Sequence, residues 1–361
     1  MPPLPLASEP EVKPAHAASR DAMPAHGPMR GPGHASELRS GDLVRVLPAS
    51  EILATLDGKG ALDGLVVMPE MLEFCGKELR VYRRAEQIVT DNVPIGEGES
   101  RVRSFRGNDV VLLEGVRCSG GHHGDCKRGC MIFWKESWLE RAGAVSTAAP
   151  EDSGREVGEE GTELLSTTSP SGRMFCQSSE IVKATLHLSG RDRLRICMKS
   201  IANANYSPWQ MMGMLATWVR WKIQQKIMGV FPRGECETTP GESLALQPGE
   251  MVQVKRLDEI VSTLDKRGKN RGLHFSPDMI PFCGKQLRVR SRADNLVAEG
   301  TGEMRHLKNT VILEDATCNS ATFAFGGCTR DDLLYWREIW LRRISNSPAA
   351  QPPGAMAQAG V

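Results

Sequence analysis

The sequence predicts a mainly β protein with helices, of the α+β class, in which two tandem small SH3-like β-barrel modules are joined by a flexible linker and a helical segment. Residues 41–81 align without a gap with residues 249–289, and 20 of the 41 positions are identical, which indicates a tandem duplication. Within each copy, short alternating apolar runs are separated by turns that contain glycine or proline. Three to five short strands of this spacing close most economically as a small, partly open barrel.

Each copy has the same expected order of elements. A strand comes first, and two short helices follow it. The second helix starts at a proline and ends at a Cys-Gly pair, where glycine suits a left-handed cap. Two further strands lead into a cysteine loop and a Trp-bearing run. The expected pairs of elements are strands 43–46 and 251–254, helices 51–56 and 259–264, helices 69–75 and 277–283, strands 79–88 and 287–297, strands 110–114 and 310–314, and loops 118–139 and 318–341.

Composition divides the chain into six regions. The first forty residues are rich in proline and cannot bury a core, and residues 143–172 are acidic, rich in Ser and Thr and free of aromatics. The expected regions are a disordered segment 1–40, a first module 41–142, a flexible linker 143–172, a helical middle region 173–240, a second module 241–344 and a disordered tail 345–361.

The overall charge favours no class of charged partner. Lys and Arg together number 45 and Asp and Glu 44, so the net charge is +1 and no global field favours nucleic acid or an acidic membrane. No apolar run reaches the roughly twenty residues of a transmembrane helix, and the first forty residues lack the apolar centre of a signal peptide. We therefore expect a soluble cytoplasmic protein, whose clustered cysteines are metal ligands or reactive thiols rather than disulfides.

The cysteines of the first module predict a zinc site. Tetrahedral zinc takes four soft or borderline ligands, and a helix end plus one loop would deliver four thiolates. The spacing C-x7-C-x3-C in the loop lacks the CxxC knuckle of familiar zinc motifs. The expected ligands are Cys75, Cys118, Cys126 and Cys130, and His122 and His123 are expected either to support them through hydrogen bonds or to serve as alternate ligands.

The second module keeps three of these cysteines and replaces the fourth with an aspartate. Its expected ligands are Cys283, Cys318, Cys328 and Asp332, and its loop lacks the two histidines. The alternative is that the thiols of both modules are simply buried, as cysteines often are. Cys176, Cys197 and Cys236 have no partner in the repeat, and we expect them to be structural.

Three further features have both a structural and a functional interpretation. The aromatic residues after the loop predict core packing, with stacking on a base or sugar as the alternative; they are Phe133, Trp134, Trp138, Tyr335, Trp336 and Trp340. The arginines on the strand after the Cys-Gly pair predict a solvated surface, with binding of an anionic ligand as the alternative; they are Arg80, Arg83, Arg84, Arg288, Arg290 and Arg292.

The third feature is a helix over 207–231. Ser207-Pro208 is a helix-start signal, and an apolar stripe follows it. We expect this helix to pack against a barrel, a protein partner or its twin in a homodimer, and an interfacial membrane helix is the alternative, since the polar face carries Arg220, Lys222 and Lys226.

The pattern GD-x-V-R-V, then F-C-G-K with R-V, then V-x-L-E, two cysteines and W-[KR]-E-x-W-L resembles a family of uncharacterised bacterial proteins that carry this unit twice around a helical middle. The resemblance spans about 41–344 and implies the arrangement of modules, but no chemistry. The second module departs from the pattern at Asp332. The GDLVRV opening is also similar to the start of SH3-like barrels in several multi-subunit enzymes, which bears on the fold and not on the function.

Three functions from different classes fit these observations. The first is a metal-stabilised binding or scaffold protein, because the sequence contains no nucleophile elbow, phosphate loop, dinucleotide fingerprint or HExxH motif. The second is a redox protein whose four first-module cysteines hold an iron–sulfur cluster. The third is a zinc enzyme in which His122 or His123 acts near an open metal position.

Overall fold

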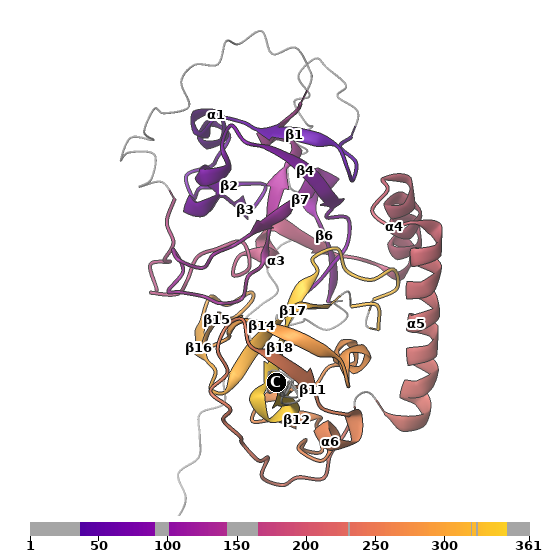
Figure 1. The fold of residues 1–361 in the computed structure, drawn as a ribbon. Coiled ribbons are helices and arrows are strands. Elements are labelled where there is room, and N and C mark those ends of the chain that lie inside the picture. The colour runs from indigo at the N-terminus through magenta and orange to yellow at the C-terminus, as the bar shows by residue number, and fades with distance from the viewer. Residues whose placement is uncertain are drawn as a thin grey trace, which may run out of the picture. The chain divides into compact units, whose positions relative to one another are not determined.

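The computed structural model describes residues 37–90, 101–142, 165–229, 232–318, 320–322 and 324–344 (Figure 1). Most of the segment 1–40, most of the linker 143–172 and the tail 345–361 lie outside these ranges, so the disorder expected for them stays a prediction. The fold is mixed α+β and mostly β, with two curled half-barrel sheets in tandem.

The two sheets have the same topology and register. The first has the order β8 (Met131–Lys135), β7 (Val110–Arg117), β4 (Glu78–Arg84), β1 (Leu43–Val46) and β9 (Leu139–Arg141). The second has the order β18 (Asp332–Arg337), β17 (Thr310–Cys318), β14 (Gln286–Arg292), β11 (Met251–Val254) and β19 (Leu341–Arg343). Val44 lies opposite Leu79 in the first sheet, and Val252 lies opposite Leu287 in the second. The gapless sequence repeat thus corresponds to two similar β modules.

Both sheets are curled, and in both the pairing of two strands shifts register at an equivalent position. The register shifts between Val81 and Arg83 where β4 meets β7, and between Val289 and Ser291 where β14 meets β17. Such bulges bend a strand and increase its twist. The core of each module contains two fully buried tryptophan side chains, Trp134 and Trp138 in the first module and Trp336 and Trp340 in the second.

Short helical turns connect the strands. The predicted early helices form α1 (Ala49–Ala54) and α6 (Leu257–Val261), and the proline-initiated ones are 3-10 turns, η1 (Pro69–Phe74) and η4 (Pro277–Phe282). Gly76 has a φ of +74°, as expected for the cap after Cys75. Two-stranded hairpins lie between these turns: β2 (Ala61–Leu62) with β3 (Leu65–Val66), and β12 (Lys269–Asn270) with β13 (Leu273–His274). The Trp-bearing runs continue from β8 and β18 through the 3-10 turns η3 (Glu136–Trp138) and η5 (Glu338–Trp340) into the last strands.

The prediction of single strands over 79–88 and 287–297 is wrong. β4 ends at Arg84, which still pairs with Val111 of β7 while its own backbone N–H donates to the side chain of Asn205 at 2.8 Å. The chain then forms β5 (Ile88–Val89), which pairs with β6 (Val102–Phe105) ahead of the 3-10 turn η2 (Arg106–Asn108). In the second module, β15 (Asn295–Val297) pairs with β16 (Met304–His306). Each module therefore has a second, smaller sheet.

The middle region packs onto both modules. It contains α3 (Ile181–Ala184), β10 (Thr185–His187), α4 (Gly190–Ala202) and α5 (Pro208–Met228), and β10 joins β6 as a third strand. α5 begins where the sequence predicts, because Ser207 and Gln210 form a reciprocal capping box. α4 is a helix that the sequence did not lead us to expect. Among the described residues, no helix is both long and apolar enough to cross a membrane.

Candidate metal site in the first module

The loop from Cys118 to Cys130 folds around the carbonyl oxygen of Gly120. This oxygen accepts hydrogen bonds from the backbone N–H of His123 at 3.0 Å and of Cys126 at 3.2 Å. Gly120 has a φ of +76°, and a Cβ there would lie 1.8 Å from the Cys126 carbonyl oxygen, so only glycine fits. The Cys118 N–H donates to the Cys130 carbonyl at 2.8 Å and closes the loop. This fold holds the His123 side chain inside the protein.

Glu70, Cys118 and His123 bring one potential ligand atom each to within 4.8 Å of the others. Glu70 belongs to η1, Cys118 follows β7, and His123 lies in the loop. The Cys118 thiol donates to Glu70 Oε1 at 2.9 Å, and His123 Nδ1 lies 3.5 Å from the same oxygen. In the part of the chain that the structure describes, this is the one such group of three His, Cys or acidic residues.

Burial sets the protonation of this cluster. Burial first, and the adjacent Glu70 carboxyl second, raise the pKa of the Cys118 thiol far above its ordinary value of 9.0. Burial lowers the pKa of His123 below 6.5, against the opposing effect of Glu70. At neutral pH the thiol is therefore protonated and the imidazole neutral. Cys118 alone is no activated nucleophile, but a cation that displaces its proton would find sulfur, nitrogen and oxygen ligands together.

Several polar atoms of the cluster lack hydrogen-bond partners among the described residues. Glu70 Oε2 and both ring nitrogens of His123 are buried and make no hydrogen bond within the described part of the chain, although His123 Nδ1 has the 3.5 Å contact with Glu70 Oε1. The backbone of Phe175 lies close enough to the His123 ring to raise its pKa, against the larger lowering by burial. A buried polar group without a partner costs about 1–3 kcal/mol. Three such atoms in one cluster are unusual for a purely structural core.

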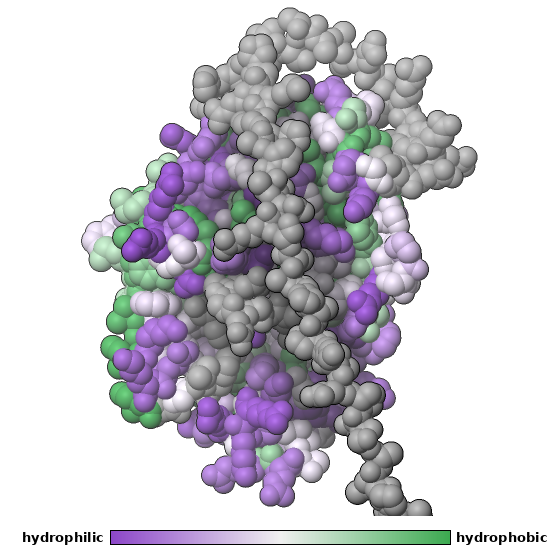
Figure 2. All heavy atoms as spheres, turned by 180° about the vertical axis from the view of Figure 1, so that it is seen from behind, coloured by the Kyte–Doolittle hydropathy of each residue, from purple (hydrophilic) through white to green (hydrophobic). Residues whose placement is uncertain are grey.

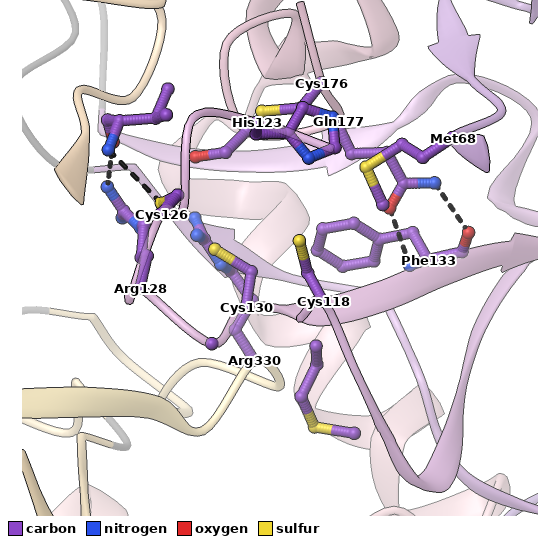
Figure 3. A pocket seen from close by; sticks show the side chains of 14 residues that line it. Met68, Cys118, His123, Cys126, Arg128, Cys130, Phe133, Cys176, Gln177 and Arg330 are labelled. Atoms are coloured by element: carbon purple, nitrogen blue, oxygen red, sulfur yellow. Dashed lines mark hydrogen bonds between the residues drawn. The ribbon is translucent and has the colours of Figure 1, made fainter. Parts of the chain in front are cut away.

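A cavity adjoins the cluster and contains further thiols. Figure 3 shows the Cys118 and Cys130 thiols turned toward this space and Cys126 beside Arg128, with His123 and Cys176 along the other side. Gln177 of the middle region closes one end, since its side chain accepts from the Phe133 N–H and donates to the Phe133 and Val66 carbonyls. The cavity thus brings the cluster next to three thiols that are not in it.

The structure places only some of the predicted first-module ligands in the cluster. Cys118 is in the cluster, and His123 contributes a potential ligand atom directly. Cys126 and Cys130 line the cavity, and burial raises the pKa of Cys130 to about 12. Cys75 packs against the module's core and does not line the cavity, and burial raises its pKa to about 11; His122 is exposed. The set of four thiolates stays a prediction.

The second module has a related cluster without an imidazole. The Cys318 thiol donates to Asp278 Oδ2 at 2.9 Å, and Thr322 Oγ1 donates to Asp278 Oδ1 at 3.1 Å. Ser320 Oγ lies 3.2 Å from Cys318 Sγ. The hydroxyl group of Thr322 thus satisfies the second carboxylate oxygen of Asp278, whereas the corresponding oxygen of Glu70, Oε2, has no such partner.

The other predicted ligands of the second module lie apart from this cluster. Asp332 forms an ion pair with Arg330 at 3.2 Å, and Cys283 packs against the core. Cys328 Sγ accepts a hydrogen bond from the Val89 N–H at 3.3 Å.

Sequence reasoning missed Glu70. The signal was available in the repeat, because Pro69-Glu70 and Pro277-Asp278 place an acidic residue at the same position of both copies, 208 residues apart. Both carboxyl groups are buried. A shared carboxyl group beside a helix-starting proline is ordinarily explained as favourable for the helix N-terminus, which hides its proximity to the cysteine loop.

The aromatic and arginine features have largely structural explanations. The four tryptophans are fully buried, and Trp138 and Trp340 donate to Thr55 and Thr263 at 3.0 and 3.1 Å, which confirms core packing for them. Arg84 and Arg292 form ion pairs with Glu136 and Glu338, and Arg83 pairs with Asp331 at 2.8 Å. Arg80, Arg288 and Arg290 are exposed, so an anionic ligand would meet those three.

Comparison with protein-family models, with curated proteins and with solved structures finds no match to this chain. The chemistry of the site therefore carries the functional argument.

Proposed function

We propose that this protein is a metal-stabilised two-module binding or scaffold protein, and that its first module binds one zinc ion through Glu70, Cys118 and His123. A thiolate, an imidazole and a carboxylate are all established zinc ligands. This proposal keeps the metal and the module predicted from the sequence and changes the ligand set. Cytoplasmic location is part of the same proposal.

The observation that supports it most is the set of buried, unpartnered atoms in the cluster, namely Glu70 Oε2 and the two ring nitrogens of His123. A cation bound between the three side chains would give these atoms a partner and take up the Cys118 thiolate. The ligands come from η1, from the end of β7 and from the loop, which are separate segments of the module. Binding would therefore hold the loop to the barrel.

We also propose that each half-barrel is SH3-like. The five strands of each main sheet are hydrogen-bonded to one another in the order last, first, second, third and fourth along the chain. A 3-10 turn precedes the last strand. This order and this turn are typical of SH3-like barrels. Such barrels are used for binding in many proteins, which agrees with a scaffold function.

Elemental analysis of the purified full-length chain tests the metal proposal. We expect about one zinc per chain in the wild type and a loss of most of it in Cys118→Ser, His123→Ala and Glu70→Gln. The matched controls are Cys318→Ser and Asp278→Asn in the related cluster of the second module, and Cys75→Ser; these should retain zinc. Iron with acid-labile sulfide would favour the iron–sulfur alternative. Protein that is folded, holds no metal and does not bind added zinc would refute the proposal.

A zinc enzyme is the second candidate, and the cavity beside the cluster favours it. Three protein ligands leave a fourth position of a tetrahedral site for water or substrate, as in catalytic zinc sites. Cobalt-substituted protein separates the two roles, because thiocyanate or azide changes the visible spectrum of an open site. An unchanged spectrum favours the structural role, in which a residue such as Cys130 completes the site.

A further inference from the structure

α5 carries large apolar side chains on a face that the described chain leaves exposed. Trp209, Met212, Val219, Ile223 and Ile227 each have between 47% and 78% of their surface accessible. Their spacings of three, seven, four and four residues place them along one side of the helix. We call these five residues the outer stripe. Figure 2 shows hydrophobic residues along the left edge of the molecule, where α5 lies in that view.

The outer stripe is additional to the face with which α5 packs on the protein. Met211, Met214 and Trp221 are buried, and Trp218 contacts Phe325 edge-to-face with 5.4 Å between ring centroids. α5 is thus apolar on two sides, and only one of them is used within the described fold. Exposed apolar surface of this extent on a soluble domain generally marks an interaction site.

The charges around the outer stripe are almost all positive. α5 contains Arg220, Lys222 and Lys226 and no acidic residue, and all three cations are exposed. The neighbouring α4 adds exposed Arg191 and Arg195 and two exposed apolar residues, Leu194 and Met198. The single acidic residue of α4, Asp192, accepts a hydrogen bond from the capping Ser189. A partner for this surface must be apolar and negatively charged.

We propose that the outer stripe docks on the surface of an anionic lipid bilayer, with α5 lying in the plane of the interface. Interfacial helices combine a long apolar face, which often includes Trp, with Lys and Arg beside it. The stripe extends over eighteen residue steps, about 27 Å at the rise of an α-helix. Anionic headgroups would neutralise Lys222 and Lys226 while Ile223 and Ile227 enter the acyl boundary. A second copy of this chain would instead bring two positively charged faces together.

Flotation of the full-length protein with lipid vesicles tests this proposal. We expect binding to phosphatidylcholine vesicles that contain phosphatidylglycerol, at least about tenfold weaker binding to pure phosphatidylcholine, and weakening by added salt. Ile223→Ser/Ile227→Ser should reduce binding about tenfold, because it removes buried apolar area. Leu43→Ser, an exposed leucine of β1, is the matched control and should bind as the wild type does.

A second pair of variants tests the contribution of charge. Lys222→Gln/Lys226→Gln should weaken binding to the anionic vesicles and make it less dependent on salt. The matched control is Arg305→Gln/Lys308→Gln, which changes two exposed cations of the second module. This control should bind the vesicles as the wild type does. All substituted side chains are exposed, and circular dichroism verifies folding.

Three results would overturn the proposal. The first is that the wild type does not float with the anionic vesicles. The second is that the variants of the outer stripe bind as tightly as the wild type, since binding would then be electrostatic and unrelated to this face. The third is self-association in sedimentation velocity without lipid that Ile223→Ser/Ile227→Ser abolishes, which would assign the face to a second copy.

Discussion

Cys126 Sγ accepts a hydrogen bond from the backbone N–H of Val297 at 3.3 Å, so a cysteine of the first module contacts a strand of the second. The reciprocal contact exists: Cys328 accepts from Val89, also at 3.3 Å, and Val89 and Val297 are equivalent positions 208 residues apart. The residue after each cysteine also forms a hydrogen bond to the other module: the Lys127 N–H donates to the Asn295 carbonyl, and the Thr329 N–H donates to the Gln87 carbonyl. Each cysteine loop thus pairs with the small sheet of the other module.

The contact region between the two modules contains a buried charge cluster that should couple the stabilities of the modules. Glu299 forms ion pairs with Arg128 at 3.0 Å and Arg330 at 2.5 Å, and the Glu299 and Arg330 side chains are almost completely buried. Glu299→Gln leaves two buried guanidinium groups without their shared carboxylate. We expect a loss of about 3–5 kcal/mol in the free energy of unfolding, measured by guanidinium titration. Glu303→Gln, which breaks an exposed pair with Arg173, should cost less than about 1 kcal/mol. Equal effects would show that the modules are not coupled through this cluster.

Cys126→Ser tests whether the buried thiol of the loop is structural. The substitution puts a hydroxyl group into an apolar cavity wall, and the shorter C–O bond moves the acceptor atom away from the Val297 N–H, so we expect a loss of about 1–3 kcal/mol. His122→Ala, at the exposed neighbour of His123, should change stability by less than about 0.5 kcal/mol. Thermal unfolding of the two variants gives the comparison. Equal destabilisation would mean that His122 has a structural role that the described contacts do not show.

The sequence alone predicted the duplication, the order of most elements and the helix start at Ser207, because these depend on local signals that a single chain contains twice. It did not predict Glu70 as a site residue, since the contact with Cys118 joins positions 48 residues apart. Nor did it predict that strand 79–88 divides, because at the end of β4 the backbone of Arg84 bonds to the side chain of Asn205, a residue of the middle region. The exchange between Cys126 and Val297 depends on how the two modules pack, and no local pattern encodes that.

Arg84 and Arg292 should hold the segment that precedes the first strand of each module against that module. Arg84 donates to the Leu38 carbonyl at 2.7 Å and pairs with Glu136, and Arg292 donates to the Leu246 carbonyl at 3.1 Å and pairs with Glu338. Leu38 and Leu246 are equivalent positions just before the first strand of each module.

Glu338→Gln tests this role of Arg292. Glu338 is fully buried and also accepts from the N–H groups of Leu244, Ala245 and Leu246. Its loss weakens these buried hydrogen bonds and leaves Arg292 with Asp294 as its remaining ion-pair partner. We expect a loss of about 1–3 kcal/mol in the free energy of unfolding, measured by chemical denaturation. Glu314→Gln, which breaks an exposed pair with Arg288, is the control and should cost less than about 1 kcal/mol. An effect no larger than that of Glu314→Gln would show that Glu338 does not stabilise the module through these contacts.

Zinc affinity should increase with pH, with a slope that identifies the number of thiols among the ligands. The pKa of Cys118 is raised above 9.0 and that of His123 is lowered below 6.5, so between these values the thiol is protonated and the imidazole neutral. Binding then releases one proton, and the association constant should increase about tenfold per pH unit. Competition with a chromogenic chelator measures it. In Cys118→Ser the residual affinity should no longer follow pH in this way. A flat profile would exclude Cys118 as a ligand. A steeper profile would mean that further thiols bind zinc. Cys75 and Cys130, whose pKa values are raised to about 11 and about 12, would each release another proton on binding.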